Sequence, residues 1–291
     1  MLAIDIDGTL LDSRGRIPRA NIEAITAARL AGMFVTLCTG RGLIESIFAA
    51  KAVGQREPMV VAGGSIIACP VTHATLHRYA MPREIVARAA ETLLSYQLPV
   101  MVLKDPVSAG YDYLMVIGPE KYALDPVTQW WLESLAVRVR YADHLDDDDH
   151  PEHTVRFGAC AHAERLDPIC DQLHEAIGHA VSLHHFPAVV APEHAREPEP
   201  GKTLHVLEGF AREASKWTAI SHLAAQRGIE PSRIAAIGDQ INDLSMISAA
   251  GLGIAMGNAV SSITTAATRH TRSNDEAGVA HAIENILKGQ W

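Results

Sequence analysis

The sequence predicts an α/β fold with a doubly wound, mostly parallel sheet and an inserted α+β domain. At both ends of the chain, short apolar runs alternate with segments of helical periodicity, and several of these runs stop at a glycine-rich or acidic turn. Between them, from about residue 81 to 208, helical and strand-like runs follow one another without such turns. Strands that alternate with helices need crossover connections, which favour a parallel sheet.

The first part of the core is expected at residues 1–80. Leu2–Ile6 is a short apolar run, and Pro18–Ala31 carries apolar residues at helical spacing, with proline near its start and Gly32 just past its end. The stretch MFVTLCTGR predicts a second strand, and Met59–Ala62 predicts a third before a Gly-Gly turn. In a doubly wound sheet, ligands bind at the carboxyl ends of such strands.

Residues 81–208 predict the inserted α+β domain. Its helical runs are Pro82–Tyr96 and Glu164–Gly178, and its strand-like runs are VMVLKD, YLMVIG, VRVRYA, TVRFGACA and AVSLHHF. Two hydrophilic segments, Asp143–His153 and Ala191–Lys202, are expected to be linkers or surface loops. The histidines and aspartates of the first segment have no fixed coordination spacing, which favours a solvated face over a metal site.

Residues 209–291 predict the return to the core. Lys216 begins the amphipathic helix KWTAISHLAAQRG, and RIAAIGD and GLGIAMGN repeat the pattern of a strand followed by a turn. This second part supplies the remaining strands of the doubly wound sheet.

Composition favours a small-molecule partner over a polymer or a membrane. The formal net charge is −9 and the pI is about 5.9, without a basic block for nucleic acid or anionic lipid. The four cysteines show no CxxC spacing, which predicts reduced thiols. Since no apolar run approaches ~18 residues and the start has acid instead of a basic leader, we expect a cytoplasmic protein of unknown oligomeric state.

Four polar clusters are predicted to meet at the carboxyl end of the sheet. They are Asp5 with Asp7, Thr39 in the turn TGR, Lys216, and Asp239 with Asn242 and Asp243. Each alone has a structural interpretation as a helix cap, a turn or a solvated charge. Clustered carboxylates repel unless a cation lies between them, and hard oxygen ligands suit Mg²⁺. A hydroxyl, turn N–H groups and a lysine are donors for an anion. Together they predict a Mg²⁺ site for a phosphate ester, where two aspartates can divide the roles of nucleophile and proton donor.

With these motifs the chain resembles the haloacid dehalogenase-like hydrolases, and within them the Cof-type phosphatases. The stretch DIDGTLLDSRGRIPRANIEAITAARLAGMFVTLCTGR is similar to the family's beginning, and GDQINDLSMISAAGLGIAMGNA and SNDEAGVAHAIENIL are similar to its end. The insertion between GGSII and Lys216 stands where that subfamily carries a C2-type α+β cap. The resemblance therefore implies a Rossmann-like core, an inserted cap domain and hydrolysis of a small phosphorylated metabolite.

The resemblance also implies a role for each motif residue. Asp5 would attack phosphorus and become an aspartyl-phosphate, and Asp7 would be the general acid and base. The metal group would comprise Asp5, the main-chain carbonyl of Asp7, Asp239 and, in support, Asp243. The phosphate group would comprise Thr39, the Gly40 amide, Arg41, Lys216 and Asn242. An acid at position 7 favours a phosphatase or phosphomutase over a dehalogenase or transport ATPase.

Two departures from the family pattern leave the substrate open. Gly63 stands where Cof-type chains usually have asparagine, and Trp217 follows the lysine where they usually have glycine. We expect Trp217 to pack against the core, with a pocket wall as the alternative. A phosphomutase of the phosphomannomutase type and a non-catalytic phosphate sensor are the competing hypotheses, and the sequence does not distinguish a sugar phosphate from a nucleotide or cofactor phosphate.

Overall fold

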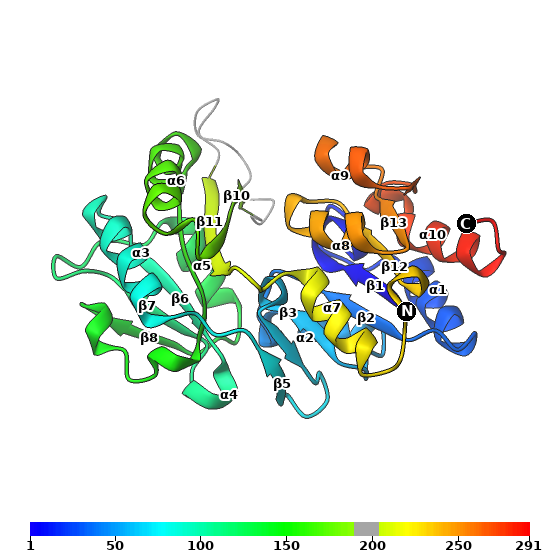
Figure 1. Ribbon diagram of the computed structural model, residues 1–291, viewed down its shortest axis with the longest axis horizontal. Helices are drawn as coiled ribbons and strands as arrows, with labels where there is room; N and C mark the ends of the chain where they lie inside the picture. The colour runs from blue at the N-terminus through cyan, green and yellow to red at the C-terminus, as the bar shows by residue number, and fades with distance from the viewer. Residues whose placement is uncertain (189–203) are drawn as a thin grey trace. The chain divides into compact units, whose positions relative to one another are not determined.

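The computed structural model describes residues 1–188 and 204–291, which divide into two compact units (Figure 1). The first unit comprises Met1–His77 and Ser215–Trp291, and the second comprises Arg78–Ala214. The second unit is therefore an insertion between two halves of the first.

The first unit contains an eight-stranded sheet with helices before and after its strands. Its strands are β1 Leu2–Asp5, β2 Val35–Cys38, β3 Met59–Val61, β4 Ile66–Ala68, β5 Thr75–Arg78, β12 Ala235–Gly238, β13 Leu252–Ala255 and β14 Arg269–His270. Its α-helices are α1 Arg19–Leu30, α2 Leu43–Ala52, α7 Lys216–Ala225, α8 Leu244–Ala249, α9 Ser261–Ala266 and α10 Gly278–Leu287.

Strand β1 lies inside this sheet, whose order is β14-β13-β12-β1-β2-β3-β4-β5. It pairs in parallel with β12 on one side and β2 on the other, with Ile4 opposite Ile237 and Leu37. The pairs β2–β3, β12–β13 and β13–β14 are also parallel, and β3–β4 is antiparallel. The predicted doubly wound, mostly parallel α/β fold is confirmed, and the carboxyl ends of β1, β2 and β12 lie at one edge.

Alternate residues of the buried strands face opposite layers of helices. On one face, Ala3 and Ala236 belong to a cluster that includes Ile220 and Leu223 of α7 and Met246 of α8. Small strand residues allow helices to approach closely, and each fully buried aliphatic side chain contributes about 1.5–3 kcal/mol. Helices α1 and α10 pack against one another elsewhere in the same unit. The resulting core holds the strand ends rigidly.

The second unit is an α+β domain with a six-stranded sheet of order β10-β11-β9-β6-β7-β8. Its strands are β6 Val100–Lys104, β7 Tyr113–Val116, β8 Val139–Ala142, β9 Thr154–His162, β10 Val181–Pro187 and β11 Leu204–Ala211. Its helices are α3 Arg83–Ser95, α4 Pro106–Ala109, α5 Pro126–Ser134 and α6 Ala163–Ile177. Strands β7 and β8 are parallel, and the other pairs are antiparallel.

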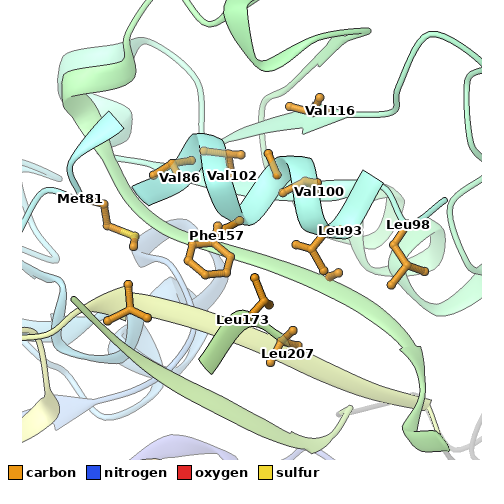
Figure 2. Packing of buried hydrophobic residues seen from close by; sticks show 14 of the residues in the cluster. Met81, Val86, Leu93, Leu98, Val100, Val102, Val116, Phe157, Leu173 and Leu207 are labelled. Carbon is orange, nitrogen blue, oxygen red and sulfur yellow. The ribbon is translucent and has the colours of Figure 1, made fainter. Parts of the chain in front are cut away.

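The core of the second unit lies between α3, α6 and one face of the sheet. Val86 and Leu93 of α3 and Leu173 of α6 share a cluster with Phe157 of β9 and Leu207 of β11, as Figure 2 shows. These residues recur at helical spacing in the helices and at alternate positions in the strands. The unit thus has a hydrophobic core of its own.

One expected boundary of this unit differs in the structure, and one expected loop cannot be compared with it. The boundary expected at residues 208 and 209 falls within β11, where the polar residues His205 and Glu208 obscure the apolar strand pattern. The loop predicted at Ala191–Lys202 lies outside the described residues. Among the residues described, no helix has the length and apolar character to cross a membrane.

Candidate active site

Strand β1 ends at Asp5, and the chain turns sharply over Ile6–Leu10. Asp5 is only 4% exposed, whereas Asp7 lies partly exposed in the turn. Gly8 has a φ of +73°, in the left-handed region, and a Cβ there would overlap Asp239 Oδ2. Glycine is therefore required both by the backbone conformation and by the close approach of the end of β12.

Lys216, the first residue of α7, lies between two carboxylates. Its Nζ donates to Asp5 Oδ1 and to Asp243 Oδ1, each at 2.6 Å. Lys216 and Asp243 are fully buried, and the side chain of Ser215 caps the helix by accepting from Thr218 N at 3.1 Å. The cap fixes where α7 begins and so where its lysine lies.

Asp239, just after β12, is held by two residues that the sequence reasoning did not single out. Thr9 Oγ1 donates to Asp239 Oδ1 at 2.9 Å. Asn258 Nδ2 donates to the Gly8 carbonyl at 2.8 Å and lies 3.5 Å from Asp239 Oδ2. Both residues follow strands, Thr9 in DIDGT and Asn258 in GLGIAMGN, so their places after strands were the available signal.

Asp243 organises the turn that follows β12. Its Oδ2 accepts from the backbone N–H groups of Asp239 at 2.9 Å and Gln240 at 3.1 Å, while Oδ1 accepts from Lys216. A Cβ at Gly238 would overlap the Asp243 side chain, which explains glycine at the end of this strand. Asp243 therefore positions both the lysine and the backbone beside Asp239.

One ammonium group, which contacts Asp5 and Asp243, lies near the three carboxylates, so the cluster keeps excess negative charge. Burial, followed by the charge of Asp243, raises the pKa of Asp5 well above its usual value and raises the pKa of Asp239 to about 7. For Lys216, burial lowers the pKa, but the charges of Asp243 and Asp5 outweigh burial and raise it. A cation is the partner that such a cluster favours.

These residues fit a hard divalent cation. Asp5, Asp239 and Asp243 each offer a carboxylate oxygen, and the three oxygens lie within 4.8 Å of one another. An all-oxygen donor set suits Mg²⁺ better than a softer metal. The side chain of Asp7 has a different partner, so the predicted contribution of Asp7 through its main-chain carbonyl stays a prediction.

The side chain of Asp7 pairs with Arg41. Arg41 Nε donates to Asp7 Oδ2 at 2.8 Å, and a terminal guanidinium nitrogen donates to Oδ1 at 2.7 Å. This bidentate, charge-assisted pair is largely buried, with the arginine side chain 13% and the aspartate side chain 25% exposed. Arg41 therefore lies beside the candidate acid, and a phosphate contact from Arg41 stays a prediction.

Thr39 lies directly after β2 and is fully buried. Its Oγ1 accepts from Arg41 N at 3.1 Å, and its carbonyl accepts from Gly63 N at 3.0 Å. A Cβ at Gly40 would lie 3.5 Å from Asn242 Nδ2, so the turn after β2 lies next to the turn after β12.

In the part of the chain that the structure describes, Asn242 Oδ1 is buried without a hydrogen-bond partner. A buried acceptor of this kind costs about 1–3 kcal/mol of stability unless a ligand donates to it.

The two departures from the family pattern have local explanations. Gly63 has a φ of +66°, a left-handed conformation that asparagine also tolerates. Trp217 is partly buried and packs against the hydrophobic cluster of α7 and α8, which confirms the expected packing. Both substitutions leave the carboxylates and Lys216 in place.

Comparisons with known proteins match nearly the whole chain. A family model described as haloacid dehalogenase-like hydrolase matches residues 2–283. A Bacillus subtilis 5-amino-6-(5-phospho-D-ribitylamino)uracil phosphatase, YwtE, is 30% identical to this chain. The match covers 100% of this chain and 99% of YwtE. Another B. subtilis protein, the phosphatase YwpJ, is 29% identical and covers 99% of both chains.

Solved structures show the same fold. A haloacid dehalogenase-like hydrolase from Bacteroides thetaiotaomicron superposes with a TM-score of 0.76 at 26% identity, covering 98% of both chains. Similarity over nearly the full length of relatives and solved structures includes both units of the chain.

Proposed function

The chain belongs to the haloacid dehalogenase-like hydrolase family, and from this premise we propose that it is a Mg²⁺-dependent phosphatase acting through an aspartyl-phosphate. Its substrates would be small phosphorylated metabolites. Relatives named as phosphatases support this proposal, and so do the three carboxylates around Lys216. The contact of one buried lysine with both Asp5 and Asp243 is the observation that carries it.

Asp5 is the proposed nucleophile. Its Oδ1 accepts a hydrogen bond from Lys216. The other carboxylate oxygen, Oδ2, is the atom that we propose attacks phosphorus. Attack forms a bond from Oδ2 to phosphorus and breaks the bond from phosphorus to the ester oxygen. Water then attacks the phosphorus of the aspartyl-phosphate, which releases phosphate and restores the carboxylate.

Asp7 is the proposed general acid and base. It would give a proton to the departing ester oxygen and later take a proton from the attacking water. Its pair with Arg41 positions the carboxyl group at the start of the turn that follows β1. We propose Arg41 as a positioning residue for Asp7 in addition to its predicted phosphate contact.

The remaining groups would hold the metal and the phosphoryl group. Asp5, Asp239 and Asp243 would hold Mg²⁺, and the ion when bound would offset the negative charge of the phosphate oxygens. Lys216 Nζ is the proposed cationic donor beside the transferring phosphoryl group.

Polar groups of two adjacent turns are the other proposed phosphate ligands. They are Thr39, the Gly40 amide and Asn242. The short approach between Gly40 and the Asn242 side chain supports grouping them, and the unpartnered Asn242 Oδ1 is an acceptor for a substrate hydroxyl or a metal-bound water.

The second unit is the proposed cap, which would select the leaving group. Two relatives are named for 5-amino-6-(5-phospho-D-ribitylamino)uracil and one for pyridoxal phosphate, so both compounds belong in a substrate panel with sugar phosphates. Those names describe the relatives, and the panel decides which class this chain accepts.

The direct test is phosphate release from this panel by the purified full chain. We expect turnover with Mg²⁺, loss of turnover with excess chelator, and no turnover for Asp5→Asn. Asp12→Asn is the matched control, because Asp12 follows the same motif but pairs with Arg16 on an exposed turn. Full activity of Asp5→Asn would refute the nucleophile. Transfer of phosphate within a sugar without free phosphate would indicate a phosphomutase, and binding without turnover would indicate a sensor.

A further inference from the structure

The acidic segment of the second unit holds a cluster with metal-ligating chemistry. His150, Glu152 and His153 each offer one ligand atom, and these atoms lie within 4.8 Å of one another. His153 Nε2 is 3.1 Å from Glu152 Oε1, and the rings of His150 and His153 lie 5.9 Å apart at an interplanar angle of 30°. From the sequence, this segment is expected to be a solvated face, so the convergence is a finding of the structure.

We propose that His150, Glu152 and His153 form a binding site for a divalent transition-metal ion of the Zn²⁺ class. Two imidazoles and a carboxylate are ligands that Zn²⁺ accepts, whereas Mg²⁺ prefers oxygen ligands alone. Three protein ligands leave a fourth position for water or another ligand. This site is separate from the proposed phosphatase site, whose carboxylates belong to the first unit.

The observed spacing suits this class of ion. Two ligand atoms at about 2.0–2.1 Å from Zn²⁺, separated by a tetrahedral angle, lie about 3.3 Å from each other. The distance between His153 Nε2 and Glu152 Oε1 is 3.1 Å, close to that value. The third ligand atom, from His150, lies within 4.8 Å of the other two and has to move closer to reach this separation.

The two ring nitrogens of His153 have different surroundings. In the described part of the chain its Nδ1 is buried and has no hydrogen-bond partner, while Nε2 faces the carboxylate. When Nε2 carries the proton, it donates to Glu152 Oε1. A cation in place of that proton keeps both Nε2 and Glu152 Oε1 in favourable contact, so this pair can become two ligands of one ion.

The backbone beneath the cluster is held by buried groups. Lys104, which is fully buried, donates from Nζ to the His150 carbonyl at 3.2 Å and to Thr154 Oγ1 at 2.7 Å, and it also pairs with Asp148. The His153 carbonyl accepts from Asp105 N at 2.8 Å. Fixing both carbonyls reduces the entropy that must be lost when the side chains bind an ion.

Three aspartates of this segment have basic partners, which distinguishes them from Glu152. Asp148 pairs with Lys104, Asp149 pairs with Arg140, and Asp146 pairs with Arg83 at 2.8 Å. These pairs offset three negative charges of the acidic run, whereas Glu152 lies against a histidine ring. Glu152 is thus a carboxylate beside imidazoles, which is the arrangement that a His₂Glu site needs.

The test is calorimetric titration of the full chain with Zn²⁺ in buffer that contains excess Mg²⁺, so that the carboxylate cluster of the first unit is occupied. We expect one Zn²⁺ per chain for wild type. His150→Ala and Glu152→Gln should each weaken Zn²⁺ binding by at least ~10–100-fold. Loss of a residue that only hydrogen-bonds to a metal ligand already has an effect of this size. His144→Ala is the matched control, because His144 is exposed in the same segment and lies outside the cluster, and it should bind as wild type does.

Co²⁺ supplies a second readout that does not depend on activity. With Mg²⁺ in excess, wild type and His144→Ala should develop the visible absorption of low-coordinate Co²⁺, and His153→Ala should lose it while keeping its far-ultraviolet circular dichroism. Unchanged Zn²⁺ affinity in both His150→Ala and Glu152→Gln would overturn the proposal. It would also be overturned if wild type bound no Zn²⁺ under these conditions.

Discussion

Asp239→Asn is expected to stabilise the metal-free protein increasingly as pH rises. Burial, and then the charge of Asp243, raises the pKa of Asp239 from 3.8 to about 7. A carboxyl group with a raised pKa binds its proton more tightly in the folded protein than in the unfolded chain. Its favourable contribution is therefore present below the unfolded pKa and is lost as pH rises through the folded pKa.

The size of the effect follows from these two pKa values. Between them, each unit of pH removes about 1.4 kcal/mol of stability, so the loss from pH 5 to pH 7 is about 2–3 kcal/mol. Asparagine removes the titrating charge, and its amide oxygen can still accept the hydrogen bond from Thr9. The gain in unfolding free energy of the variant over wild type should thus be about 2–3 kcal/mol larger at pH 7 than at pH 5.

Urea unfolding with excess chelator at both pH values measures this difference. The control is Asp12→Asn, because hydrogen bonds from the Arg16 backbone lower the pKa of Asp12, so removal of its charge should give no gain as pH rises. Adding Mg²⁺ at pH 7 should stabilise wild type and have little effect on Asp239→Asn, because an ion that binds the folded state stabilises it. A variant that gains no more at pH 7 than at pH 5 would refute the electrostatic reasoning.

Three further substitutions separate the proposed roles. With p-nitrophenyl phosphate, Asp7→Asn should release a burst of about one nitrophenolate per site and then turn over slowly. With a sugar phosphate, its turnover should fall by ~10²–10⁴-fold without a burst. Equal slowing of both substrates without a burst would exclude acid–base catalysis by Asp7. If Arg41 acts through Asp7, Arg41→Ala should lower kcat about 10–100-fold with a sugar phosphate and less with p-nitrophenyl phosphate. Steady-state kinetics with both esters would show an equal loss if Arg41 does not act through Asp7. Lys216→Met should destabilise the metal-free protein by about 3–5 kcal/mol in urea at pH 7 and less at pH 5, where the carboxylates bind protons; the same cost at both pH values would contradict this.

The convergence of the strand-end clusters could be predicted from the sequence. Asp5 ends β1, and Thr39 and Asp239 directly follow β2 and β12, and parallel neighbours deliver such residues to one edge of a sheet. The helix that begins at Lys216 and the core helix at residues 19–30 could be predicted because apolar periodicity and the residues at helix ends act locally.

Contacts that depend on side-chain direction could not be predicted in the same way. Residue spacing places Asp7 and Arg41 on different turns and says nothing of their bidentate contact, which depends on the backbone path after β1. The cluster at His150 depends on Lys104, a buried side chain 46 positions earlier in the chain. Such long-range contacts carry no periodic signal, so sequence reasoning treats the segment as solvated.

The two aspartates of the opening motif differ in environment although one residue separates them. Asp5 ends a buried strand, is bonded to a fully buried lysine, and has a pKa raised by burial and by Asp243. Asp7 stands in the turn, is partly exposed, and contacts an arginine instead. A nucleophile must be fixed and unprotonated when it attacks, so Lys216 and the proposed metal ion have to offset the raised pKa of Asp5. A general acid and base must instead exchange protons with the leaving group and with water. Because a turn begins between them, two chemically identical side chains can take different roles, and the substitutions at positions 5 and 7 test that division.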